Sequence, residues 1–454
     1  MKIRQCFLIF AACLMLEQAT IAQTRHVVLI SIDGLHPDMY LDPGWPALNL
    51  RQMMKQGTYA EHMLSVFPSY TYPSHTAMLT GALPARNGIY FNQPVGSKGD
   101  WNWFADNIKV PTLWKVLKQN GKTTAAVEWP VSVTKDITWN IPEIWSDEHP
   151  DRITESRKYA TSGLVEEIER NATGKLDSVN MNEDAFSMDD NSARMAAYIF
   201  KTRKPALLAV HFACVDGKEH DDGRDADSVR LALAEVDHNI GFILETIKES
   251  KSADSTAVII VGDHGFSTIN QVMRPNMLIR NVPARFIAAG GSAFLYRHAR
   301  ANVSNTSVIR TVIDSLNALP KAKRKLFRII DKKELDRMGV DSAALLALSG
   351  VNGSGLVFSG ASAPAKTTNH GPGTFIQQSK YDGVFYPTDG GHHGYDPSNQ
   401  EMYTGFIAWG AGIVKGGHID HLSEPDIAVL IAKLLVIDFH GPDGKYVNGI
   451  IQIN

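Results

Sequence analysis

The sequence predicts an α/β fold with a central, mostly parallel sheet, and three observations support this class. Apolar, β-branched runs at 26–32, 205–212 and 257–261 are typical of buried parallel strands. A long amphipathic pattern at 225–250 predicts the helix that crosses over between the last two runs. Each run is followed by acidic or imidazole side chains, and ligands of open α/β sheets lie at the carboxyl ends of strands.

The chain begins with a pattern typical of a secretory signal peptide. A basic start precedes an apolar run at 7–16 that is too short to span a bilayer. Small residues up to Ala22 predict cleavage after that position, so residues 1–22 are expected to be removed and the mature chain to be secreted or periplasmic. Lipidation at Cys13 is a less favoured alternative, because the apolar run continues past it.

Composition and charge exclude several classes of protein. Of 454 residues, 44% are hydrophobic and 20% are charged, which is typical of a globular chain. The formal net charge of -3 gives no reason to expect a nucleic-acid partner. After the signal, no run approaches the roughly 18 apolar residues of a membrane helix. Cys214 is then the one remaining cysteine, so no intrachain disulfide is expected.

The first strand leads directly into Asp33, which alone is explained equally well as a turn cap or as a metal ligand.

A helix is predicted at 45–57. Residues 66–76 follow as a rigid, irregular loop, because Pro68 and Pro73 stand close together there. The next helix is predicted from Thr76. Hydroxyls before it are well placed to become nucleophiles, but they are more often helix caps unless a metal lies nearby.

Further along, the helical patterns are at 111–120 and 191–203, with a strand at 122–128. Tryptophans are concentrated between 101 and 145, which predicts either core and loop packing or the wall of a binding cleft. Asp216 and His220 follow the strand at 205–212 and stand on either side of Gly217. In a tight loop, this spacing lets both side chains face one ion.

Residues 270–390 break the alternation of strands and helices, and we interpret them as a cap-like subdomain packed beside the site. They include a basic run at 321–325, which is more typical of a solvated face than of an anion patch. The catalytic core is then expected over 23–269 and 391–454. A returning strand and an apolar helix close it.

Together, the strand ends and a late histidine supply three carboxylates and three imidazoles: Asp33, Asp216, His220, Asp263, His264 and His393. Nitrogen and oxygen ligands without thiolates suit zinc, or another divalent ion such as manganese. Six ligands are too many for one tetrahedral ion and fit two ions that share a nucleophile. Two such ions form a clamp for in-line displacement at phosphorus.

At this point the sequence resembles the alkaline phosphatase superfamily, and specifically its nucleotide pyrophosphatase/phosphodiesterase family. The matching segments occur in the family's order: Ile32-Asp33-Gly34, 67–75, Asp216 with His220, Asp263-His264-Gly265 and His393-Gly394-Tyr395-Asp396. The resemblance implies a three-layer core of the alkaline phosphatase type with an inserted cap. Ser74 and Pro397 depart from the family's usual asparagines, which puts substrate detail in doubt more than the metal site.

The resemblance also implies roles for individual residues. Thr71, rather than the nearby Ser69, would be the nucleophile and would hold one zinc together with Asp33, Asp263 and His264. Asp216, His220 and His393 would hold the other zinc, and the Gly-Tyr-Asp that follows favours His393 over His392. Asn92 would donate to a phosphoryl oxygen. Tyr72 would either stack on a nucleobase or pack the loop.

The implied function is a secreted two-zinc phosphodiesterase/nucleotide pyrophosphatase that forms a covalent phosphothreonine. Its substrate would be a small phosphate diester such as a nucleotide. A phosphomonoesterase or a phosphonoacetate hydrolase-like enzyme on the same site stays open as an alternative, although no cation clearly matches the second charge of a monoester. A secreted metal-binding protein without activity is the alternative of another class. The complete set of ligands and the intact nucleophile argue against it.

Overall fold

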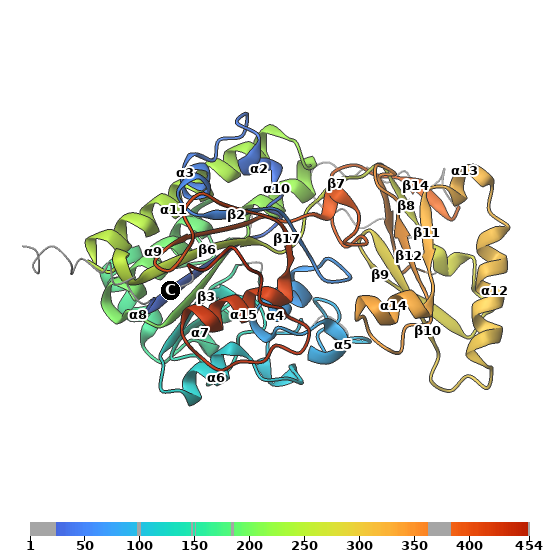
Figure 1. Cartoon of the computed structure of the whole chain (residues 1–454). Helices are drawn as coiled ribbons and strands as arrows, with labels where there is room; N and C mark the ends of the chain where they lie inside the picture. The colour runs from blue at the N-terminus through green and yellow to red at the C-terminus, as the bar shows by residue number, and fades with distance from the viewer. Residues whose placement is uncertain are drawn as a thin grey trace, which may run out of the picture.

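The computed structural model describes residues 24–97, 101–146, 149, 151–182, 186–361 and 383–452, so the predicted signal peptide lies outside the described residues. Within them, a central sheet of eight strands has the order β17-β2-β16-β6-β1-β5-β3-β4. All neighbouring pairs are parallel except those of β16, which is antiparallel to β2 and β6. The α/β class with a mostly parallel sheet is therefore confirmed (Figure 1). The strands are β1 (His26–Ile32), β2 (Thr58–Leu64), β3 (Thr124–Trp129), β4 (Trp139–Pro142), β5 (Leu207–Phe212), β6 (Thr256–Gly262), β16 (Phe406–Gly410) and β17 (Gly417–Ser423).

The register of the three central strands brings their carboxyl ends to one level. Ile32, the last residue of β1, lies opposite Phe212 on β5 and opposite Gly262 on β6. All three strands are buried on both faces, which is why their sequences are continuous apolar runs instead of alternating ones. The residues that follow these strands must therefore meet at one edge of the sheet.

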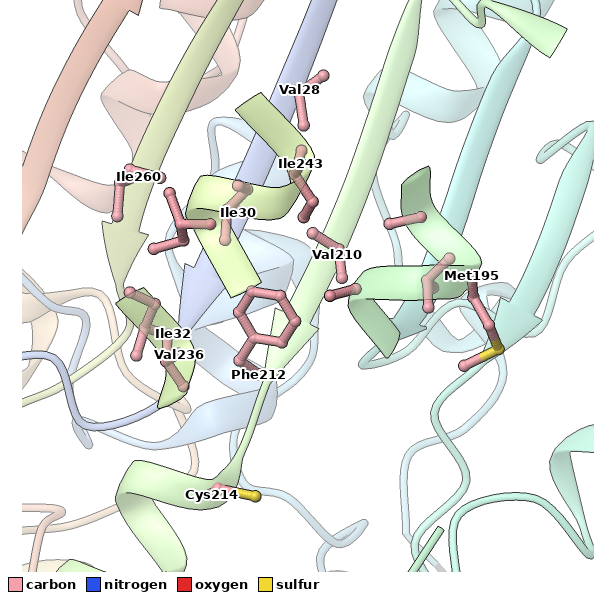
Figure 2. Packing of buried hydrophobic residues seen from close by; sticks show 14 of the residues in the cluster. Val28, Ile30, Ile32, Met195, Val210, Phe212, Cys214, Val236, Ile243 and Ile260 are labelled. Carbon is pink, nitrogen blue, oxygen red and sulfur yellow. The ribbon is translucent and has the colours of Figure 1, made fainter. Parts of the chain in front are cut away.

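Helices cover both faces of the sheet and give the core three layers. Val28, Ile30 and Ile32 belong to one buried cluster with the apolar sides of α9 (Phe186–Arg203) and α11 (Asp227–Glu249). Figure 2 shows Val236 and Ile243 of α11 beside these side chains, and Met195 of α9 beyond Val210 of β5. The alternate residues of β1 face α4 (Thr71–Thr80), α6 (Leu113–Gln119) and α15 (Glu424–Leu434). Each fully buried aliphatic side chain contributes about 1.5–3 kcal/mol, so this double burial holds the site's scaffold rigid.

A second group of strands lies beside this core (Figure 1). Its four-stranded sheet has the order β11-β12-β10-β9, and its three-stranded sheet has the order β13-β8-β14. A two-stranded sheet of β7 and β15 joins the two ends of the segment that we interpreted as the cap. The cap boundaries at 270 and 390 stay a prediction. The elements are β7 (Ser267–Thr268), β8 (Gln271–Met273), β9 (Ala284–Ala289), β10 (Ser292–Arg297), β11 (Phe327–Ile330), β12 (Ala347–Gly350), β13 (Leu356–Phe358), β14 (Phe385–Pro387), β15 (Gly391–His392), α12 (Asn305–Asn317), α13 (Lys321–Arg324) and α14 (Lys332–Met338).

Two local expectations are corrected. The helix after the proline-rich segment begins at Thr71, not at Thr76, because Pro73 falls in its first turn, where a missing N–H costs no hydrogen bond. Asp216 and His220 lie on a helix, α10 (Cys214–Asp222), and not in a loop. The remaining helices are α2 (Asp38–Leu41), α3 (Leu48–Gln56), α5 (Pro84–Asn87), α7 (Ser156–Tyr159) and α8 (Leu164–Ile168). Among the described residues, none of the helices has the length and apolar character needed to cross a membrane.

Candidate metal centre and active site

The potential metal ligands gather at the carboxyl ends of β1, β5 and β6. Asp33 follows β1, Asp263 and His264 follow β6, and α10 carries Asp216 and His220 directly after β5. His393 comes from the other side, immediately after β15. Two overlapping groups result, Asp33 with Asp263 and His264, and Asp216 with His264 and His393. Within each group the donor atoms lie within 4.8 Å of one another.

The first group surrounds the Nε2 atom of His264. This atom lies 3.2 Å from Oδ1 of Asp33 and 3.4 Å from Oδ2 of Asp263. The hydroxyl oxygen of Thr71 is 3.4 Å from the same nitrogen. Four donor atoms therefore converge on one small volume, with a hydroxyl among them.

The second group is centred on Asp216, whose two oxygens face different imidazoles. Oδ2 lies 3.6 Å from Nε2 of His220, because residues four apart share one face of α10. Oδ1 lies 3.8 Å from Nε2 of His393 and 4.0 Å from Nε2 of His264. The rings of His264 and His393 stack with their centroids 3.6 Å apart, so the two groups are in direct contact.

His392 also stands near this group, since it forms a third cluster with His220 and His393. Its Nδ1 accepts a hydrogen bond from the backbone N–H of His393. Nδ1 of His393 instead donates to the carbonyl of Ser69 at 2.9 Å, which leaves its Nε2 for the cluster. Of the two rings, His393 is the one whose Nε2 lies 3.8 Å from Oδ1 of Asp216.

Hydrogen bonds orient the other donors in the same way. His220 donates from Nδ1 to the carbonyl of Gly391 and keeps Nε2 free for a ligand role. Oδ1 of Asp263 accepts from the backbone N–H groups of Gly34 and His264. This pattern, in which the second atom of a ligand is anchored, is typical of metal sites.

Three of the carboxylate oxygens among these donor atoms have no hydrogen-bond partner among the described residues. Oδ1 of Asp33, Oδ1 of Asp216 and Oδ2 of Asp263 are all buried and unpartnered. Burial and the charge of Asp216 raise the pKa of Asp33 well above its usual value, and burial and the charge of Asp33 do the same for Asp263. Buried carboxylates of this kind require a cation or a proton. The mixed oxygen and nitrogen donors fit divalent metal ions, as the sequence predicts.

Thr71 stands at the N-terminus of α4, beside the potential metal ligands. The backbone N–H of the next residue, Tyr72, donates to Oδ1 of Asn92 at 3.0 Å. This bond sets the Asn92 amide so that its NH₂ group is free to donate. Thr71, Asn92, Asp33 and Asp216 all line a cavity of about 280 Å³. The structure thus places a hydroxyl and an amide donor in the space that the ligands border.

Tyr72 is fully buried at the wall of this cavity. Its hydroxyl donates to Glu143, and its ring meets the edge of Trp101 at a centroid distance of 5.1 Å. These contacts correspond to the packing alternative. Trp101 and Trp145, whose ring centroids are 4.4 Å apart, are more exposed aromatic surfaces in the same cavity.

Sequence reasoning missed a buried chain that supports the site. Nε2 of His211 donates to Oδ2 of Asp33 at 3.1 Å, and Nδ1 donates to Oε2 of Glu143 at 2.8 Å. Arg152 pairs with the other oxygen of Glu143 at 3.4 Å. Burial alone would lower the pKa of His211, but the hydrogen bond and charge of Glu143 raise it. The one available signal was a histidine inside an otherwise apolar strand.

A family model and several known proteins are similar to this chain. The family described as type I phosphodiesterase / nucleotide pyrophosphatase matches residues 27–396. A bis(5'-adenosyl)-triphosphatase of Xenopus laevis is 24% identical over 55% of this chain and 49% of its own length. An ectonucleotide pyrophosphatase/phosphodiesterase family member 7 of Rattus norvegicus is 22% identical over 95% of this chain and 87% of its own length.

Solved structures share the fold. Murine ectonucleotide pyrophosphatase/phosphodiesterase 5, an inactive variant in complex with AMP, superposes with a TM-score of 0.64 at 19% identity. The superposition covers 93% of this chain and 97% of that one. The human protein of the same name gives a TM-score of 0.62 at 18% identity, over 92% of this chain and 97% of that one.

Proposed function

Because this chain belongs to the type I phosphodiesterase/nucleotide pyrophosphatase family, we propose that it is a secreted hydrolase of phosphate diesters with Thr71 as its nucleophile. The observation that carries the proposal is the position of the Thr71 hydroxyl, 3.4 Å from His264 among unpartnered buried carboxylate oxygens. Its substrate would be a small diester such as a nucleotide. No nucleic-acid partner is proposed.

The proposed ligand sets are those that the resemblance implies. Asp33, Asp263, His264 and Thr71 would hold one zinc ion, and Asp216, His220 and His393 would hold the other. Manganese or another divalent ion suits the same donors. Two bound ions would supply Lewis acidity, which lowers the pKa of a hydroxyl and offsets charge on the phosphoryl oxygens.

The reaction would proceed in two displacements. Oγ1 of Thr71 attacks phosphorus, and a new O–P bond forms as the bond to the leaving oxygen breaks. The Asn92 amide donates to a non-bridging oxygen as negative charge develops there. Water then attacks the phosphothreonine, and the bond between phosphorus and Thr71 breaks. One proton of that water restores the Thr71 hydroxyl, whose own proton left with the departing alcohol in the first displacement. The net reaction adds one water and releases an alcohol and a phosphate monoester.

The experiment that tests the proposal compares hydrolysis of bis-p-nitrophenyl phosphate and p-nitrophenyl phosphate, with and without chelator. We expect chelator-sensitive turnover that favours the diester and that Thr71→Ala abolishes. Thr311→Ala, an exposed threonine on α12, is the matched control. Near-normal turnover by Thr71→Ala would overturn the nucleophile assignment. Hydrolysis of neither compound by a zinc-loaded protein would favour a metal-binding protein without activity.

A phosphomonoesterase is the second candidate, and Arg152 is the observation that favours it. Its guanidinium lines the same cavity as Thr71 and could face the second charge of a monoester. The carboxylate of Glu143 offsets that charge at 3.4 Å, which is why we place diesters first. The same pair of substrates decides between the two, and release of phosphate from phosphonoacetate would test the third alternative.

A further inference from the structure

A larger cavity of about 950 Å³ joins the proposed active site to the cap-side strands. It shares Asn92, Trp101, His220 and His393 with the smaller cavity that Thr71 lines, so the two cavities lie side by side. One wall is the loop at 93–97, and the opposite wall is β9 with the residues just before it. The volume lies within the range of about 300–1,000 Å³ that small-molecule sites have.

The charges that line the two cavities differ in sign. Four carboxylates and one arginine line the smaller cavity, so carboxylates predominate there: Asp33, Glu143, Asp216 and Asp221, with Arg152. The larger cavity is lined by Arg280 and Arg285, and no described Asp or Glu borders it. Neither arginine forms an ion pair with a carboxylate in the described part of the chain. A ligand group with negative charge is therefore favoured on the cap side of the metal centre.

Arg285 is held on a well-supported strand. It belongs to β9, the edge strand of the four-stranded sheet, and pairs with Tyr296 of β10. The side chain of Asn276 hydrogen-bonds the backbone of the next residue, Phe286, on the unpaired side of β9. It accepts from the N–H of Phe286 at 2.6 Å and donates to the carbonyl of Phe286 at 2.9 Å. An Nη atom of Arg285 lies 3.9 Å from where a Cβ on Gly96 would stand, so the guanidinium reaches the opposite wall.

We infer that this cavity is a leaving-group subsite in which Arg280 and Arg285 bind phosphates carried by the departing half of the substrate. The inference rests on the proposed function and names the leaving group of that same site. A guanidinium fork matches phosphate oxygens in a bidentate manner, and an unpaired arginine gives up no existing partner to do so. The Thr71–phosphorus bond forms, the phosphoanhydride bond breaks, and the departing phosphate leaves with both electrons of that bond.

The test uses two substrates that transfer the same group to Thr71. Thymidine triphosphate releases pyrophosphate, whereas p-nitrophenyl thymidine monophosphate releases p-nitrophenolate, which carries no phosphate. For Arg280→Glu and Arg285→Glu, we expect the kcat/KM ratio of the first substrate to the second to fall by about tenfold or more. Arg285→Lys, which keeps the charge but loses the fork, should lower the ratio less. Arg310→Glu, an exposed arginine on α12 outside the cavity, should leave it unchanged.

The possible results test the leaving-group subsite and the proposed phosphodiesterase activity independently. A ratio that stays constant in Arg280→Glu and Arg285→Glu would overturn the inference, whether both activities fall together or neither falls. A native protein that cleaves the p-nitrophenyl ester but not the triphosphate would overturn the subsite and leave the phosphodiesterase standing. A native protein that cleaves neither would overturn the proposed function itself.

Discussion

Replacing Glu143 by glutamine removes the charge that holds His211 against Asp33. Glu143 accepts from Nδ1 of His211 at 2.8 Å, and His211 donates from Nε2 to Oδ2 of Asp33 at 3.1 Å. Both ring nitrogens can donate only while the imidazole carries its positive charge. In Glu143→Gln, that charge loses one of its two buried carboxylate partners, so the pKa of His211 falls and the neutral ring can donate from one nitrogen only.

The magnitude follows from burial. A hydrogen bond to a charged group contributes about 1.5–3 kcal/mol, and breaking a buried ion pair costs about 3–5 kcal/mol. Glutamine keeps an acceptor for the Tyr72 hydroxyl, so we expect a loss of about 3 kcal/mol in the free energy of unfolding. Asp33 would lose the hydrogen bond that Oδ2 accepts from His211. Loss of such an anchor lowers metal affinity by about 10- to 100-fold.

Competition with a chromophoric chelator measures zinc affinity, and kcat/KM is then measured with zinc at saturation. Glu245→Gln is the matched control, because Glu245 pairs with Lys248 on the exposed face of α11, where an ion pair is worth about 0–1 kcal/mol. Circular dichroism verifies that both variants fold. If the folded Glu143→Gln protein binds zinc within about twofold of the native affinity, the positioning role of His211 and Glu143 is wrong.

Three further predictions concern metal content, a tight turn and a helix end. In the metal-free protein the pKa values of Asp33 and Asp263 are raised, so the native state holds protons that the unfolded chain releases above about pH 4. Burial lowers the pKa values of His264 and His393, so these rings take up protons only in the unfolded chain and oppose this trend below about pH 7. The thermal midpoint should therefore fall as pH rises above about 7, and added zinc should remove this slope. Gly34→Ala should destabilise the fold by about 1–3 kcal/mol in urea unfolding, because Gly34 has a φ of +78° and a Cβ there would lie 2.2 Å from Glu219. The control is Gly121→Ala, which measures the backbone cost alone, because Gly121 has a φ of +69° and open space around the added Cβ. Asp426→Ala removes the acceptor of the capping box at the start of α15 and should cost about 0.5–2 kcal/mol, whereas an unchanged unfolding midpoint would show that the cap is dispensable.

The sequence determined the central strands, and it predicted candidate ligands, because the signals of both are local. Continuous apolar runs at β1, β5 and β6 indicate burial on both faces, and a carboxylate or imidazole directly after such a run has a short list of uses. The order of the motifs along the chain was enough to identify the family. These features can be recognised in the sequence alone because each depends only on residues that are close together along the chain.

Non-local contacts decided the helix boundaries at the site. The N-terminus of α10 is satisfied by Asp189 of α9, whose two oxygens accept from the N–H groups of Ala213 and Cys214 at 3.1 Å. That cap offsets the helix-weakening effect of Gly217, which made the segment resemble a loop. At α4, the first helical hydrogen bond runs from Ser74 to Tyr70, so Pro73 needs no partner for its missing N–H.

Tertiary structure alone decided what supports and surrounds the ligands. His211 and Glu143 are 68 residues apart, and neither belongs to a motif, so their contact depends on how β5 lies in the sheet. Arg280 and Arg285 are exposed, and only the fold shows that they line the same cavity as the loop at 93–97. Local pattern specifies which side chains can perform chemistry. Their partners and the sign of charge around them depend on chain packing, because electrostatic energies are set by distance and burial, not by sequence separation.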